Sequence, residues 1–189
     1  VLPDRIKEID DNAFYNCKKL KTINLPDSLT TLGYSVFGYS FDPDYNTKIT
    51  IPESVTSIDT YTFAWSNIKE VTILSDIKTL PSNTFYSTSK LEKVTLPETI
   101  TEIGDSAFKY SNLKIFNFSK NLKRIGSSAF EESNIENANL PDGVTEIDDS
   151  AFRGCKNLQT INLPDSLTTL GYSVFGYSFD PDYNTKITI

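Results

Sequence analysis

Few residue combinations in this sequence could carry out chemistry. There is no histidine among its 189 residues, which removes the commonest general base and the usual partner of a nucleophilic serine or cysteine. The carboxylate pairs Asp10-Asp11 and Glu131-Glu132 fall at turns, where capping and solvation account for them. No glycine-rich phosphate loop is present. The sequence therefore predicts no catalytic site, no cofactor and no enzymatic activity.

Cys17 and Cys155 are the two cysteines, and they occupy the same position of a repeated pattern, six repeats apart. At about 4.8 Å per stacked strand, they lie roughly 30 Å from each other, whereas a disulfide needs about 6 Å between Cα atoms. They cannot pair within one chain. We expect small, partly buried thiols, with an intermolecular bond as the alternative.

One acidic segment has the spacing of calcium ligands in an EF-hand-like loop. Its possible ligands are Asp42, Asp44, Asn46 and Glu53. The sixth place, where such a loop needs glycine, holds Thr47, and Pro43 stiffens the segment. We therefore predict no metal site here, with calcium binding as the alternative.

The same segment is rich in aromatic residues, which are typical anchors when they lie on a protruding loop. The candidate partner-binding residues are Tyr39, Phe41 and Tyr45, and in an identical later copy Tyr177, Phe179 and Tyr183. The two copies would present one surface twice, about 30 Å apart, which suits a repetitive partner. The alternative is that Phe41 and Tyr45 fold back over the edge of their coil.

A repeat that runs through the chain must position these residues. Its most regular member is a phenylalanine that recurs every 22 to 26 residues, at Phe14, Phe37, Phe63, Phe85, Phe108, Phe130, Phe152 and Phe175. A Pro or Ser usually lies eleven residues upstream, and an apolar triplet such as Leu20-Ile23-Leu25 precedes it. Such periodicity is the signature of stacked repeats.

Each repeat predicts the same local structure. The Ile-x-Leu segment alternates and forms a short strand that ends at Pro. A Val-Thr-x-Ile segment forms a second short strand, and a capped helical or 3-10 turn leads to the Phe. The fold class is a β-rich solenoid of stacked coils with short parallel strands. Residues 1–189 form a single array of eight coils of 22–26 residues.

The outward residue of each Ile-x-Leu strand is short, polar and uncharged. The candidate partner-binding row is Asn24, Thr50, Thr72, Thr95, Asn117, Asn139 and Asn162, and Thr188 continues it. The strand face of a solenoid commonly binds ligands. Without a charge of one sign, it suits a flat protein or glycan surface; the alternative is a row that stacked strands simply tolerate.

The pattern Leu-x-x-Ile-x-Leu-Pro…Val-x-x-Ile-x-x-x-Ala-Phe-x-x-Cys-x-x-Leu, carried by residues 6–25 and 144–163, resembles the BspA-like class of leucine-rich repeats. Ser75 and Ser119 depart from it by replacing Pro. The resemblance implies a surface or secreted protein, of the kind found in bacteria and parasitic protists, that adheres to host proteins and cells. It implies no shared catalytic motif and no fixed ligand residues.

A larger period is superimposed on the repeat. Residues 22–51 recur unchanged at 160–189, and the wider segment 6–51 is duplicated as 144–189. The chain thus holds one six-coil unit and two coils of the next, either from duplication within a longer array or from engineering. Neither terminal coil has the polar face of a cap, so we expect end-to-end association at high concentration.

The overall charge narrows the partners. A net charge of −7 and a pI near 4.6 argue against nucleic acid. No run approaches the ~20 apolar residues of a membrane span, and Val1-Leu2-Pro3-Asp4 is not a signal sequence. We expect a non-enzymatic module that binds a protein or glycan partner. The alternative is a structural spacer or self-assembling rod.

Overall fold

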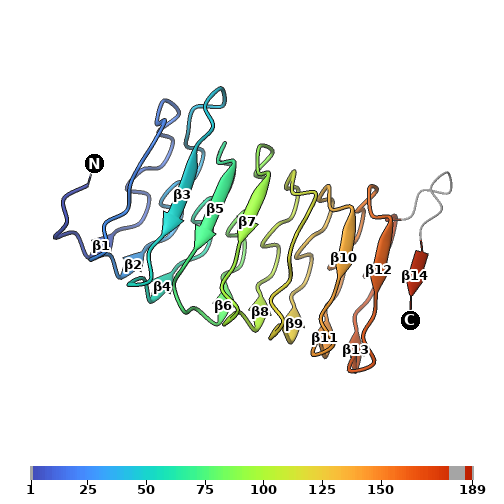
Figure 1. Ribbon diagram of the computed structural model, residues 1–189. Helices are drawn as coiled ribbons and strands as arrows, with labels where there is room; N and C mark the ends of the chain where they lie inside the picture. The colour runs from blue at the N-terminus through green and yellow to red at the C-terminus, as the bar shows by residue number, and fades with distance from the viewer. Residues whose placement is uncertain (1, 179–185, 189) are drawn as a thin grey trace.

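The chain folds into one elongated stack of parallel strands, with β1 at one end and β14 at the other (Figure 1). The computed structural model describes residues 2–178 and 186–188. Every strand pair is parallel. The predicted fold class, a β-rich solenoid, is therefore confirmed.

The Ile-x-Leu segments form the longer strands, which we call the strand face. It comprises β3 (Lys48–Ile51), β5 (Glu70–Ile73), β7 (Lys93–Thr95), β10 (Asn137–Asn139), β12 (Thr160–Asn162) and β14 (Lys186–Thr188). Ile49, Val71 and Val94 are aligned in register and buried. Because successive side chains alternate across a strand, the residues between them face outward.

A second set of two-residue strands follows the turn at the end of each longer strand. It comprises β1 (Glu8–Ile9), β2 (Thr31–Leu32), β4 (Ser57–Ile58), β6 (Thr79–Leu80), β8 (Glu102–Ile103), β9 (Arg124–Ile125), β11 (Glu146–Ile147) and β13 (Thr169–Leu170). The second residue is buried in all of them except β13, whose Leu170 is exposed. Leu170 has the sequence position of Leu32, which β4 covers.

The strand face is interrupted in its middle. Between the sheets β3-β5-β7 and β10-β12-β14, residues 115–117 make a single bridge, from Ile115 to Asn137. Phe116 fills the inward position there, with its ring centroid 5.0 Å from that of Phe108 and 5.4 Å from that of Phe130. A ring thus takes the place of the smaller side chains that the neighbouring strands bury, Val94 in β7 and Ala138 in β10.

The repeated phenylalanines form the centre of the core. Consecutive rings stack from Phe14 to Phe175, with centroids between 5.1 Å (Phe108–Phe130) and 5.9 Å (Phe152–Phe175) apart. Aromatic pairs of this kind contribute about 0.5–1.5 kcal/mol each beyond the area that they bury. The stack holds each coil against the next.

The helical or 3-10 turn predicted before each Phe is wrong. The described residues contain no helix; the segment is a run of hydrogen-bonded turns instead. Around Phe14, for example, the N–H groups of Asn12, Phe14 and Asn16 donate to carbonyls of the next coil at 2.8–3.0 Å. Those bonds join neighbouring coils, whereas the bonds of a helix would lie within one segment.

Two residues of each such segment adopt a left-handed backbone conformation, one two places before the Phe and one two places after it. They include Asn12 and Asn16 in the first coil and Ser150 and Gly154 in the seventh. This conformation costs most L-residues roughly 1–2 kcal/mol. The bonds to the next coil offset that cost in a stacked array. We call this surface of the solenoid the turn side.

Candidate functional site

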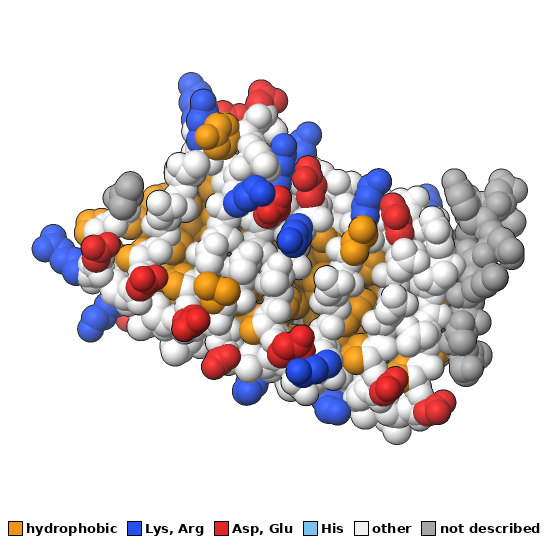
Figure 2. All heavy atoms as spheres, viewed as in Figure 1, with side chains coloured by type: hydrophobic (Ala, Val, Ile, Leu, Met, Phe, Trp, Pro, Cys, Tyr) orange, Lys and Arg blue, Asp and Glu red, His pale blue; other side chains and the backbone are white. Residues whose placement is uncertain are grey.

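The strand face exposes the polar row that the sequence predicts. Asn24, Thr50, Thr95, Asn117 and Asn139 are exposed, and Thr72 and Asn162 are half-buried. Register places Thr50 beside Thr72, and Thr72 beside Thr95. Figure 2 shows this face covered mostly by uncharged polar groups, with hydrophobic side chains between them. Partner binding by this row stays a prediction.

A groove of about 710 Å³ opens in this face between residues 23–25 and β3. Its walls include the predicted residues Asn24 and Thr50, together with the apolar side chains of Ile23, Leu25 and Leu74. Leu74 is 48% exposed, so the groove offers apolar as well as polar contacts. Two predicted site residues therefore share a concave surface here.

The groove exists because the ladder opens at this point. Residues 22–24 form no strand, although the identical residues of β12 pair with β14. β12 is also held on its other side by β10. In the described residues, no strand precedes residues 22–24 in this ladder, so they are held less firmly in an extended conformation.

The prediction that Phe41 contacts a partner is wrong, because its side chain is 0% exposed. Phe41 folds back, as the alternative stated, whereas Tyr45, which the alternative also included, is exposed. The Phe41 N–H donates to the Cys17 carbonyl at 3.2 Å, and its own carbonyl accepts from the Asn67 amide at 3.1 Å. Its ring packs 5.5 Å from that of Phe37, so Phe41 belongs to the core.

The two tyrosines of the segment are exposed, Tyr39 by 38% and Tyr45 by 41%. The Lys21 ammonium lies 5.6 Å above the Tyr45 ring. In the second copy, Tyr177 is 79% exposed, with the Arg153 guanidinium 5.1 Å from its ring. Phe179 and Tyr183 lie outside the described residues.

Sequence reasoning missed a line of aromatic side chains along the turn side, which we call the aromatic row. Its members are Tyr15, Tyr39, Trp65, Tyr86 and Tyr110. Consecutive ring centroids are 5.5, 5.0, 5.3 and 5.7 Å apart. Each member stands one or two residues after the repeated Phe. Comparing those two positions from coil to coil would have revealed the row in the sequence.

The row ends at an ion-pair cluster. Glu131 is buried and accepts hydrogen bonds of 2.7 Å from both Lys109 and Arg153. Burial alone raises the pKa of the Glu131 carboxyl, but the hydrogen bonds from Lys109 and Arg153 outweigh it and lower that pKa. Lys109 also lies 5.2 Å from the Tyr110 ring. These charges tie neighbouring coils together.

The acidic segment and the buried cysteine make local contacts within the described residues. Asp42 accepts a 3.0 Å hydrogen bond from the Asp44 N–H, which closes a local turn. Across residues 2–178 and 186–188, no three acidic or cysteine side chains converge in a way that would hold a metal ion. Cys155 is buried and its thiol donates to the Phe130 carbonyl, and burial raises the pKa of this thiol to about 12.

Solved structures of similar shape are leucine-rich repeat proteins. A leucine-rich repeat protein from Bacteroides ovatus is 30% identical, with a TM-score of 0.81 over 94% of this chain and 46% of its own. A leucine rich cell surface protein from Faecalibacterium prausnitzii is 21% identical, with a TM-score of 0.58 over 92% of this chain and 69% of its own. The pneumococcal vaccine antigen PcpA is 20% identical, with a TM-score of 0.50 over 93% of this chain and 59% of its own. The chain thus spans about half the length of the Bacteroides protein.

No curated protein matches the sequence. In the part of the chain that the structure describes, no helix is long and apolar enough to cross a membrane. The model of the BspA type leucine rich repeat region matches residues 1–114, 38–155 and 78–182 in overlapping copies. Together these matches extend over nearly the whole chain, and they agree with the stacked strands and the phenylalanine core. The chain therefore belongs to the BspA-type leucine-rich repeat family.

Proposed function

We propose that the chain is a non-enzymatic binding module of a surface or secreted protein, which adheres to partner proteins or glycans through its strand face. The observation that carries the proposal is the groove beside β3, because it places Asn24 and Thr50 next to the exposed Leu74. Binding sites commonly combine a concave apolar wall with a few polar groups. The Faecalibacterium protein is a leucine rich cell surface protein, and this supports the proposed location.

The outward row of the strand face suits a partner without strong charge, while the groove wall also holds Asp27 and Glu53. Lys48 is paired with Glu70 at 2.8 Å, so these two charges compensate each other beside the groove. The outward row itself is uncharged. Such a surface binds through hydrogen bonds and apolar contact, which protein and glycan surfaces both offer.

The test is binding of the intact chain to an array of purified extracellular-matrix proteins and mammalian glycans. Thr50→Arg places a long charged side chain in the groove and is expected to weaken binding about tenfold or more. Thr79→Arg is the matched control, because Thr79 is an exposed threonine on the other set of strands, in β6. Equal loss in both variants would contradict the groove as the binding site, and binding to nothing on the array would indicate a spacer.

A further inference from the structure

The turns of the solenoid form without the side chains of the aromatic row. At the same positions after the repeated Phe, the sixth coil has Glu131 and Glu132, and the seventh has Arg153 and Gly154. The turn side keeps its left-handed residues and inter-coil hydrogen bonds in those coils too. The five aromatic side chains of the first five coils are therefore not needed to form the turns.

The row is also accessible. Tyr15 is 45% exposed and Tyr39 and Tyr110 are each 38% exposed, while Trp65 and Tyr86 are half-buried between them. Tyrosine and tryptophan supply large contact areas at protein interfaces, because each combines an apolar ring with a polar group. A line of such residues across five coils is a surface of the size and composition that a partner needs.

The ring geometry favours a protein over a sugar. The Tyr39 and Tyr61 rings lie parallel to that of Trp65, 8° and 11° from its plane, and Tyr86 meets it edge on. Because ring faces at the centre of the row are directed at one another, solvent meets ring edges and phenol hydroxyls. Stacking on a sugar would need an open face, whereas ring edges, which carry partial positive charge, suit carbonyl and carboxylate oxygens.

The charges beside the row point to an acidic partner. In the first five coils, the residues after each Phe include nine Lys or Arg and only four Asp or Glu, although the whole chain is acidic. These segments are residues 15–25, 38–51, 64–74, 86–96 and 109–118. Lys48 and Lys93 belong to the strand face, and Lys109 and Lys114 are paired with glutamates, so the other five are the positive charges that bear on the row. The segments before each Phe, residues 3–14, 26–37, 52–63, 75–85 and 97–108, hold eleven acidic and three basic residues.

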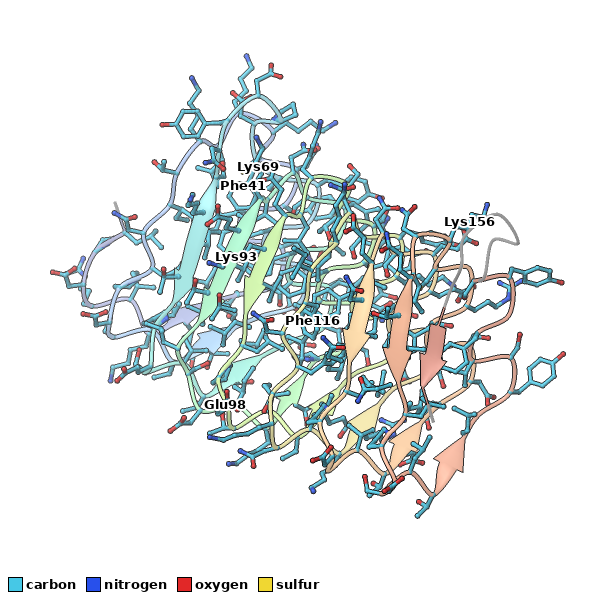
Figure 3. All side chains as sticks on the ribbon, turned by 45° about the vertical axis from the view of Figure 1, so that its right-hand side comes forward. Phe41, Lys69, Lys93, Glu98, Phe116 and Lys156 are labelled. Atoms are coloured by element: carbon cyan, nitrogen blue, oxygen red, sulfur yellow. The ribbon has the colours of Figure 1, made fainter. Side chains whose placement is uncertain are left out.

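The structure separates part of these two sets of charges, while Lys93 lies in β7 of the strand face. Lys69 and Lys156 project from one margin of the array, and Glu98 projects from the opposite margin (Figure 3). Lys18, Lys19 and Lys90 are exposed and follow the row members Tyr15 and Tyr86 by three or four residues, so the chain keeps them within a few residues of the row. The aromatic row therefore lies beside positive charge.

We propose that the aromatic row and its neighbouring lysines bind an acidic segment of a partner protein, in which carboxylates alternate with apolar or aromatic side chains. The carboxylates meet the lysines, and the apolar side chains pack on Tyr15, Tyr39 and Tyr110. This site lies on the turn side, away from the outward row of the strand face, and it is independent of binding at the groove.

The experiment measures binding of the whole chain to a random copolymer of glutamate and tyrosine, with a copolymer of lysine and tyrosine as the charge control. The acidic copolymer is expected to bind with an affinity that falls as salt is added. The basic copolymer is expected not to bind. Tyr39→Ala and Tyr15→Ala are each expected to weaken binding about tenfold. Tyr45→Ala is the matched control, since Tyr45 is equally exposed but lies outside the row.

A charge reversal tests the lysines separately. The double variant Lys18→Glu, Lys19→Glu is expected to abolish the salt-sensitive binding, whereas Lys120→Glu, Lys123→Glu reverses two exposed charges before a Phe and leaves it intact. Circular dichroism and urea midpoints confirm that each variant is folded.

Three results would overturn the proposal. One is equal affinity of Tyr39→Ala and Tyr45→Ala for the acidic copolymer. Another is tighter binding of heparin than of the copolymer, which would assign the surface to anionic glycans. The third is a dimer in light scattering that becomes a monomer in Tyr39→Ala, which would show that the row binds a second copy of this chain. Thr50→Arg leaves binding to the row unchanged, so failure here and failure of the strand-face function are distinguishable.

Discussion

The indole of Trp65 stacks on the ring of Tyr39 in the preceding coil, with centroids 5.0 Å apart and planes 8° from parallel. Tyr61 and Tyr86 contact the same indole. Since the contact crosses from one coil to the next, Trp65→Ala is expected to lower the free energy of unfolding by about 2 kcal/mol, less than for a fully buried ring. Urea unfolding followed by circular dichroism measures the change.

Trp65→Phe is the control for that experiment, because it keeps a ring between Tyr39 and Tyr86. It should lose less than half as much stability as Trp65→Ala. If Trp65→Ala unfolds at the same urea concentration as the unchanged chain, the stack contributes nothing to stability.

Phe41 is expected to act on stability rather than on recognition. Its ring is fully buried against Phe37, and truncating a buried ring costs about 3–5 kcal/mol. Phe41→Ala should therefore shift the urea midpoint strongly, whereas Tyr45→Ala, four residues away and exposed, should stay within about 0.5 kcal/mol. If both variants changed the free energy of unfolding by the same small amount, Phe41 would not be part of the core.

Much of the fold follows from the sequence because a repeat states the same pattern many times. The spacing of the phenylalanines fixes which ring meets which, and alternation fixes the outward row from Asn24 to Asn162. The turns around each Phe could not be deduced in the same way. Their left-handed residues include Tyr39 and Trp65, and bulky residues rarely adopt this backbone conformation. The hydrogen bonds to the stacked neighbouring coil offset its cost.

The sites were harder to predict than the fold. Phe41 is of a residue type typical of binding anchors, but hydrogen bonds to the coils on both sides hold it in the core. The groove depends on the absence of a strand at residues 22–24, although the identical residues 160–162 form β12. A sequence carries no direct sign of such a difference, because the neighbouring strand decides it.

The two cysteines are expected to differ in reactivity. Cys155 is fully buried, and burial raises the pKa of its thiol to about 12, so it holds almost no thiolate at neutral pH. Cys17 is half-buried. Iodoacetamide should therefore label Cys17 and spare Cys155 in the folded chain, and label both in urea, as peptide mass spectrometry would show. Rapid labelling of Cys155 without denaturant would mean that its coil opens.

Glu131 makes the stability of the chain depend on pH. Its pKa is lowered in the folded state, because the hydrogen bonds from Lys109 and Arg153 outweigh burial. A group whose folded pKa is depressed stabilises the fold above its unfolded pKa, and this contribution is lost as the pH falls through the folded pKa. Glu131→Gln should therefore lower stability near neutral pH by about 1–2 kcal/mol, mainly through the Lys109 hydrogen bond, since the pair with the more exposed Arg153 adds little.

The difference between Glu131→Gln and the unchanged chain should shrink as the pH falls below the ordinary range of a glutamate, and vanish once Glu131 is protonated in both states. Urea midpoints at a series of pH values measure it. Glu132→Gln is the matched control, because Glu132 is the exposed neighbour in the sequence. A gap between Glu131→Gln and the unchanged chain that stays constant down to acid pH would show that the effect comes from packing, because only a charge contribution disappears when the carboxylate is protonated.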